Sequence, residues 1–67
     1  PGITDTKSFR AIENAEGIVE TVTKQTPTGR LVSPEDVANV VNFLCTPDAN
    51  MIVGQFIIID GGAFIIG

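Results

Sequence analysis

The sequence predicts an α/β fold, more specifically one end of an α/β domain larger than these 67 residues. A well-capped amphipathic helix over residues 34–44 is followed by a wholly apolar run over residues 56–59 and then by a diglycine. An apolar run without polar alternation is typical of a buried parallel strand, which needs neighbours on both edges and cover on both faces. The rest of the chain has no second run of this quality. We therefore expect the chain to be incomplete by itself.

Composition limits what the chain can do alone. A protein of about this length buries only about 60% of the surface that its unfolded chain exposes. Cys45 is the only cysteine and histidine is absent, so the chain can form neither an internal disulfide nor a Cys/His zinc site. The formal net charge of -4 argues against nucleic acid or an anionic membrane as partner. No apolar run approaches the ~20 residues of a membrane span, so we expect a reducing, soluble compartment.

The first part of the chain predicts two short helices. Pro1 and Gly2 favour a turn, and the polar residues up to Thr6 can cap a helix that begins near Lys7. Phe9 and Ile12 could share one face of this helix.

A second helix is predicted after Asn14, a plausible N-cap, because Ile18, Val19 and Val22 form an apolar stripe. Gly17 within it costs about 1 kcal/mol relative to alanine, which favours two short helices with a pliable link over one long helix.

The next segments carry the clearest local signals. Thr26 to Val32 contains Pro27 and Gly29 and predicts a connection. Ser33 is a good N-cap, Pro34 suits the first helical position, and acidic residues follow it in the first turn. Valines and a leucine then recur at helical spacing until Pro47 ends the helix.

A turn over residues 48–50 precedes the predicted strand over residues 55–60. Asp60, Gly61 and Gly62 end the strand. The tail that follows is again apolar, so we expect it to dock on its own domain or on another subunit.

Few residues suit chemistry. With neither histidine nor tyrosine, the chain lacks the commonest general base and a phenolic acid, so we assign no catalytic residue and no metal ligand. Cys45 is expected on the buried side of the helix end as a small core residue, with a reactive thiol as the alternative. Asp60 and its glycines predict turn chemistry rather than an ion loop. Arg30 is expected to form an ion pair, with an anion contact as the alternative.

Three blocks carry a family resemblance: PGITDT at positions 1–6, TPTGRLVSPEDVANVVNFL at 26–44 and MIVGQFIIIDGG at 51–62. Together they resemble the C-terminal part of a short-chain dehydrogenase/reductase. Within that family the chain is most similar to the NADPH-dependent enoyl-acyl-carrier-protein reductases of fatty-acid synthesis, with 3-oxoacyl-carrier-protein reductases close behind. The glycine loop and the tyrosine-lysine pair of the family would lie upstream.

The resemblance implies the C-terminal part of a Rossmann-type doubly wound parallel sheet. Within a single domain it assigns a cofactor-edge turn (1–6), substrate lid helices (7–26), the last large helix (33–46), the last strand (55–60) and an interface tail (61–67).

The resemblance also implies roles for named residues. Pro1 and Gly2 would form the turn beside the nicotinamide of NADPH or NADH, with Ile3 packed beside the ring. The backbone of Thr4 and the hydroxyl of Thr6 would contact the cofactor, although helix capping is the alternative for both. Phe9, Ile12 and Ile18 would face an acyl-carrier-protein thioester.

Partners follow from the same resemblance: the remainder of the domain, and copies of the chain in a cytoplasmic homotetramer. Two other classes stay open. The chain could be an interaction module that adds its strand to the edge of a partner's sheet, or a fragment without a function of its own.

Overall fold

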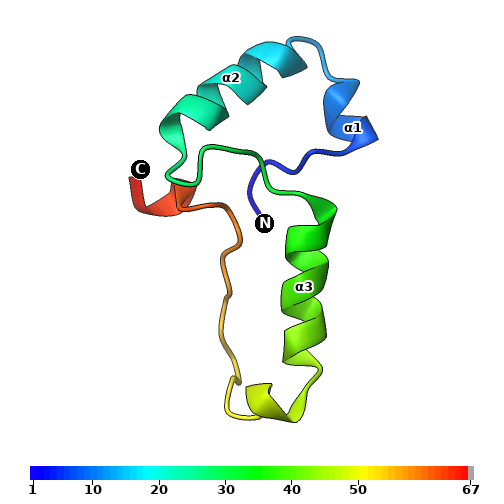
Figure 1. Cartoon of the computed structure of the whole chain (residues 1–67), viewed down its shortest axis with the longest axis vertical. Helices are drawn as coiled ribbons and strands as arrows, with labels where there is room; N and C mark the ends of the chain where they lie inside the picture. Colours follow the sequence, from blue (N-terminus) through cyan, green and yellow to red (C-terminus); the bar gives the residue numbers. More distant parts are fainter. Residues whose placement is uncertain (67) are drawn as a thin grey trace.

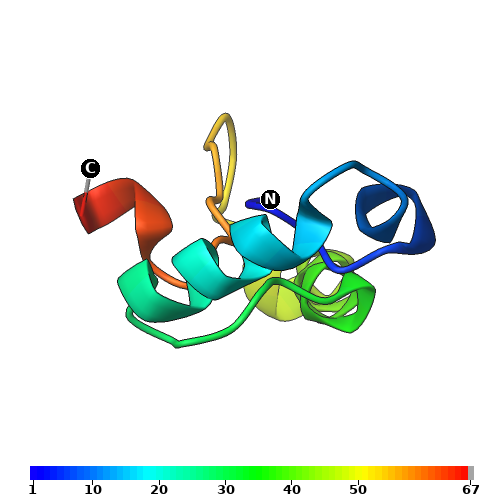
Figure 2. The same ribbon diagram turned by 90° about the horizontal axis from the view of Figure 1, so that it is seen from above.

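A computed structural model describes the backbone of residues 1–66 and the side chains of residues 1–65. Three α-helices follow one another: α1 (Lys7–Arg10), α2 (Ala15–Gln25) and α3 (Pro34–Leu44). Two short 3-10 helices, η1 (Pro47–Ala49) and η2 (Ala63–Ile66), complete the elements. The molecule is elongated, with extents of 41 × 26 × 17 Å. Figure 2 views α3 nearly end-on while α2 lies lengthwise, so the two helices point in clearly different directions.

The predicted division of the N-terminal part into two helices is confirmed. Thr6 caps α1, because its hydroxyl oxygen accepts a hydrogen bond from the Phe9 N–H. Asn14 occupies the N-cap position of α2, but its side chain makes no capping hydrogen bond and its φ is 63°. Instead, the Asn14 amide lies over Gly17, where any Cβ would overlap with it. The expected cap is therefore wrong in mechanism, and Gly17 is explained by this close approach.

The helix predicted over residues 33–46 forms as α3. Ser33 and Asp36 make a reciprocal capping box: the Ser33 hydroxyl accepts from the Asp36 N–H, and the Asp36 carboxylate accepts from the Ser33 N–H. The helix ends at Leu44, before Pro47, and Pro47 is the first residue of the 3-10 helix η1.

Cys45 contradicts the prediction, because it is exposed. It is the C-cap residue of α3, one position beyond the last helical residue. The expectation of a small core residue is wrong for this chain.

The segment predicted as a strand runs back along α3 in Figure 1. Within residues 1–66 it forms no strand ladder, and the only β pairing is a parallel bridge between Thr4 and Val32. A strand needs a partner strand for its N–H and C=O groups, and this chain has none of comparable length to provide. The strand over residues 55–60 therefore stays a prediction about a larger sheet. Of the tail over residues 61–67, Gly67 lies outside the described residues.

The core is small, and Ala49 in η1 lies apart from the rest of it (Figure 1). The buried residues are Ala15, Thr26, Leu31, Val32 and Ala49. Three of them lie in or beside the connection between α2 and α3. Segments from the beginning, the middle and the end of the chain meet around this connection (Figure 1).

Candidate functional site

A short turn over residues 2–5 is held from two sides by the backbone. The Gly2 N–H donates to the Ile59 carbonyl at 2.9 Å. On the other side the Val32 N–H donates to the Ile3 carbonyl at 3.2 Å, and the Asp5 N–H donates to the Val32 carbonyl at 2.8 Å. These three bonds fix the turn between residues that lie far away in sequence.

The pairing leaves Thr4 with its backbone directed away from Val32. In a parallel bridge the bonds come from the residues before and after the paired one, here Ile3 and Asp5. Among the hydrogen bonds of residues 1–66, none involves the N–H or C=O of Thr4. The Thr4 hydroxyl donates to the Gly2 carbonyl at 3.0 Å and tightens the turn. Thr4 thus presents one backbone donor and one backbone acceptor on a fixed frame.

Thr6 performs the capping role that was one of its two predicted roles. Its oxygen accepts from the Phe9 N–H at 3.1 Å. Acceptance uses an oxygen lone pair and leaves the hydroxyl hydrogen available to donate to a second group. Capping and ligand contact are therefore chemically compatible at this residue.

An ion pair closes the end of the turn. Arg10 donates to both carboxylate oxygens of Asp5, from Nε at 2.7 Å and from a terminal nitrogen at 3.0 Å. The hydrogen bond from Arg10 lowers the pKa of Asp5. The pair links Asp5, the residue after the bridged Thr4, to Arg10 at the end of α1.

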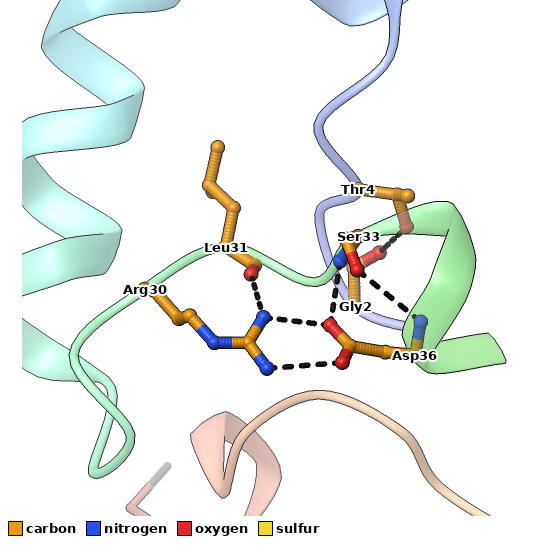
Figure 3. Close-up of polar contacts among 6 residues, drawn as sticks. All are labelled: Gly2, Thr4, Arg30, Leu31, Ser33 and Asp36. Atoms are coloured by element: carbon orange, nitrogen blue, oxygen red, sulfur yellow. Dashed lines mark hydrogen bonds and ion pairs between the residues drawn. The ribbon is translucent and has the colours of Figure 1, made fainter. Parts of the chain in front are cut away.

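A second bidentate pair joins Arg30 and Asp36 (Figure 3). The two guanidinium nitrogens of Arg30 lie 2.6 and 2.9 Å from the Asp36 oxygens. The same guanidinium also donates to the Leu31 carbonyl at 2.9 Å. The hydrogen bond from Arg30, and next the backbone N–H of Ser33, lower the pKa of Asp36. The predicted ion pair of Arg30 is confirmed.

A cavity of about 590 Å³ adjoins the turn. Its volume falls within the range of ligand pockets. The wall consists of apolar side chains together with a few polar groups from the connection after α2 and from the end of the apolar run: Gly2, Ile3, Val22, Gln25, Thr26, Arg30, Val32, Asp60 and Ala63.

Asp60 at this wall confirms the predicted turn chemistry. One carboxylate oxygen accepts from the Gly62 N–H at 2.9 Å and the other from the Phe64 N–H at 2.8 Å. Both oxygens are thus committed to the backbone. The described residues contain no group of three or more side chains suited to hold a metal ion.

The structure brings together only some of the residues singled out from the sequence. Gly2 and Ile3 line the cavity, whereas Pro1, Thr4 and Thr6 lie elsewhere on the turn. The residues expected to face an acyl substrate, Phe9, Ile12 and Ile18, are not among the lining residues of this cavity. Phe9 and Ile18 are half-buried, and Ile12 is 53% exposed. Their role toward a substrate stays a prediction.

Sequence reasoning did not place six other wall residues in one site: Val22, Gln25, Thr26, Val32, Asp60 and Ala63. Thr26 is 6% exposed although it stands in a connection rich in turn residues. No periodic sequence pattern indicates that Thr26 is buried, because its burial depends on the approach of Gly61 from the far end of the chain.

None of the helices in the described part of the chain is long and apolar enough to cross a membrane.

Comparison with known proteins identifies the family. The family described as "Enoyl-(Acyl carrier protein) reductase" matches residues 1–63. A 3-oxoacyl-[acyl-carrier-protein] reductase of Aquifex aeolicus is 42% identical over 64 residues, which are 96% of this chain and 25% of that protein. No solved structure matches the chain significantly.

Two further relatives carry other names. A tropinone reductase homolog of Arabidopsis thaliana is 42% identical over 62 residues, or 92% of this chain and 24% of that protein. A diacetyl reductase [(S)-acetoin forming] of Staphylococcus aureus is 54% identical over 43 residues, or 64% of this chain and 17% of that protein. The chain spans about a quarter or less of the length of these relatives. With its match over residues 1–63, the chain belongs to the short-chain dehydrogenase/reductase family.

Proposed function

We propose that this chain is the C-terminal part of an NAD(P)H-dependent reductase, and that the turn over residues 2–5, together with Thr6, binds the nicotinamide end of the cofactor. The observation that carries the proposal is the backbone of Thr4, whose N–H and C=O take no part in the hydrogen bonds of residues 1–66. A carboxamide has one donor group and one acceptor group, so it is complementary to such a backbone pair.

The neighbouring residues support the same assignment. Ile3 is 42% exposed at the wall of the cavity and offers an apolar surface beside a planar ring. The Thr6 hydroxyl can donate to a carboxamide or pyrophosphate oxygen while it caps α1. When bound, the cofactor supplies a hydride, and the residues of this chain supply orientation. The remaining part of the domain would supply the catalytic residues and the other strands of a Rossmann-type sheet.

The substrate that we propose is an acyl thioester carried on acyl carrier protein, in fatty-acid synthesis. The family description names an enoyl-acyl-carrier-protein reductase, and the name of the Aquifex relative gives the 3-oxoacyl substrate. The two substrates share the thioester and differ in the group that receives the hydride. The names of the diacetyl reductase and the tropinone reductase homolog favour a second candidate, the reduction of a small ketone.

The helices α1 and α2 would cover the acyl chain as a lid, with Phe9, Ile12 and Ile18 on the substrate side. The two helices are short and are joined by residues 11–14, and short elements of this kind are used as lids. The exposed apolar residues of α3 and of the run over residues 55–60 would contact the rest of the domain and other subunits in a cytoplasmic homotetramer.

The choice of substrate can be tested with a chimera. This chain would replace the matching residues of the Aquifex reductase, and NADPH oxidation would be followed with 2-enoyl, 3-oxoacyl and diketone substrates. We expect the chimera to oxidise NADPH with a thioester substrate. Activity confined to the small diketone would instead select the second candidate. A folded chimera that oxidises no reduced nicotinamide with any of the three would overturn the proposed function.

The cofactor contact can be tested at Thr6. Thr6→Asp keeps an acceptor for the Phe9 N–H and so keeps the cap, but removes the hydroxyl donor and adds a negative charge. We expect Thr6→Asp to raise the KM for NADPH by about tenfold, the effect of one lost hydrogen bond to a charged or polar group. Thr6→Ser, which keeps both cap and hydroxyl, is the control and should leave the KM nearly unchanged. An unchanged KM in Thr6→Asp would remove Thr6 from the cofactor site.

A further inference from the structure

Arg30 forms a network that is more extensive than an isolated surface pair. Its guanidinium contacts three acceptors: both Asp36 oxygens and the Leu31 carbonyl. Figure 3 shows the two terminal nitrogens of the guanidinium facing the two carboxylate oxygens edge to edge, and one of these nitrogens also bonds to the Leu31 carbonyl. A planar guanidinium with parallel bonds to a carboxylate fixes direction as well as distance.

Asp36 extends this network to the backbone of Ser33. The oxygen that accepts from Arg30 at 2.6 Å also accepts from the Ser33 N–H at 2.7 Å. Residues 31–33 are therefore held at both ends, by Arg30 at the Leu31 carbonyl and by Asp36 at the Ser33 N–H. We call these contacts of Arg30 and Asp36 the clamp.

The residue in the middle of the clamped segment is the one that pairs with the turn. Val32 is 6% exposed, and its N–H and C=O bond to Ile3 and Asp5 respectively. A displacement of residues 31–33 would therefore move the turn or break these two bonds. The hydrogen bond from Gly2 to Ile59 fixes the other side of the turn and does not involve the clamp.

From this connection we infer that Arg30 and Asp36 are positioning residues for the turn over residues 2–5, which they hold in place through Val32. The inference rests on the proposed function only in its consequence for the cofactor: a displaced Thr4 backbone would bind the carboxamide less well. Neither side chain needs to touch a ligand for this role.

The clamp is testable by hydrogen exchange of single amides in the full-length protein. We expect Arg30→Ala to speed exchange of the Asp5 and Val32 N–H groups by about tenfold, and to leave the N–H groups in the middle of α2 unchanged. Arg30→Lys keeps the charge but loses the bidentate geometry, so it should behave more like the alanine variant than like the parent. Unchanged exchange of both amides in Arg30→Ala would overturn the inference.

Two controls separate positioning from general stability. Lys24→Ala removes a lysine from an exposed ion pair with Glu20 on α2, at 2.9 Å, and should leave both amides unchanged. Ser33→Ala weakens the cap of α3 but leaves the Arg30 to Asp36 bonds in place. If Ser33→Ala speeds exchange at Asp5 and Val32 as much as Arg30→Ala does, the effect belongs to α3 and the inference fails.

A kinetic measurement then tests the consequence for the cofactor. Arg30→Ala is expected to raise the KM for NADPH by about tenfold with a smaller change in kcat, because it disturbs a binding surface and not the hydride transfer itself. Faster amide exchange in a protein that binds no nicotinamide cofactor would support the clamp and overturn the proposed function. A raised KM without faster exchange would overturn the clamp and leave the proposed function standing.

Discussion

Two regions of the molecule differ in whether their polar groups and apolar side chains find partners within this chain. Around the connection between α2 and α3, hydrogen bonds join residues 2–5, 26–36 and 59–62, and Thr26, Leu31 and Val32 are buried there. Along α3 and the apolar run, by contrast, large apolar side chains stay in solvent, and Phe56 is 99% exposed. Polar turn and cap signals act over a few residues and can be satisfied within this chain. The strand predicted for the apolar run would need other strands and helices from outside these residues.

The explanation of this contrast would fail if the apolar run were exposed in the full-length protein as well. We expect Phe56→Ala to lower the free energy of unfolding of that protein by about 3–4 kcal/mol, because burial of the ring in a complete sheet would be lost. Chemical denaturation measures the change. Met51→Ala is the control, since Met51 is also exposed but lies in the turn before the run. A loss of under about 1 kcal/mol for Phe56→Ala would show that nothing covers the run.

The hydrogen-bonded region should be sensitive to a single methyl group. Gly61 has φ 67°, and an added Cβ would overlap with Thr28 Oγ1 and lie 2.9 Å from Thr26 Cγ2. We expect Gly61→Ala to cost about 3 kcal/mol of unfolding free energy, from left-handed backbone strain plus crowding.

Gly29 is a matched control for this substitution. Its φ of 72° is nearly the same, but an added Cβ would meet nothing within 4 Å. Gly29→Ala should therefore cost only the backbone strain, about 1 kcal/mol. Equal losses in the two variants would mean that Gly61 does not approach Thr28 in the full-length protein.

The smallest expected effect concerns the charge of Asp36. Because its pKa is lowered in the folded state, the ionised carboxylate contributes stability above the ordinary aspartate pKa of 3.8. That contribution is lost as the pH falls below 3.8 through the lowered pKa. We expect Asp36→Asn to lower the Tm at pH 7, and the difference from the parent to shrink below pH 3.8.

Thermal melts across a pH series measure this difference. Glu20→Gln on α2 is the control, because it breaks an exposed pair between neighbouring turns of one helix, which contributes little. A difference between Asp36→Asn and the parent that stays constant down to the lowest pH would contradict the role of the ionised carboxylate.

Local signals made much of the fold predictable. Thr6 and Ser33 cap the helices that the sequence assigned to them, Asp60 bonds to the turn that follows it, and Arg30 forms an ion pair. Each of these involves groups within about six residues, where side-chain type and spacing define the geometry. The reciprocal cap between Ser33 and Asp36 is the best example.

Contacts between distant segments were beyond prediction. The bridge of Thr4 with Val32, and the approach of Gly61 to Thr28, depend on how the chain returns to its beginning, and neither has a periodic signal. Cys45 was misplaced because helical spacing gives the face of a residue but not whether another segment covers that face. The candidate site was partly predictable for the same reason: Gly2 and Ile3 are local, whereas Thr26 and Asp60 join them through tertiary packing.

The approach of Gly61 to Thr28 has a consequence for the history of the sequence. The Thr28 N–H bonds to the Gly61 carbonyl at 3.2 Å, and the Thr28 hydroxyl occupies the space that a Cβ at position 61 would need, so position 61 cannot gain a side chain while Thr28 stays fixed. Residues at these two positions should therefore covary among relatives: a side chain at position 61 requires a smaller residue at position 28, or a connection of different length. Selection on the end of the apolar run would in this way constrain the loop that leads into α3.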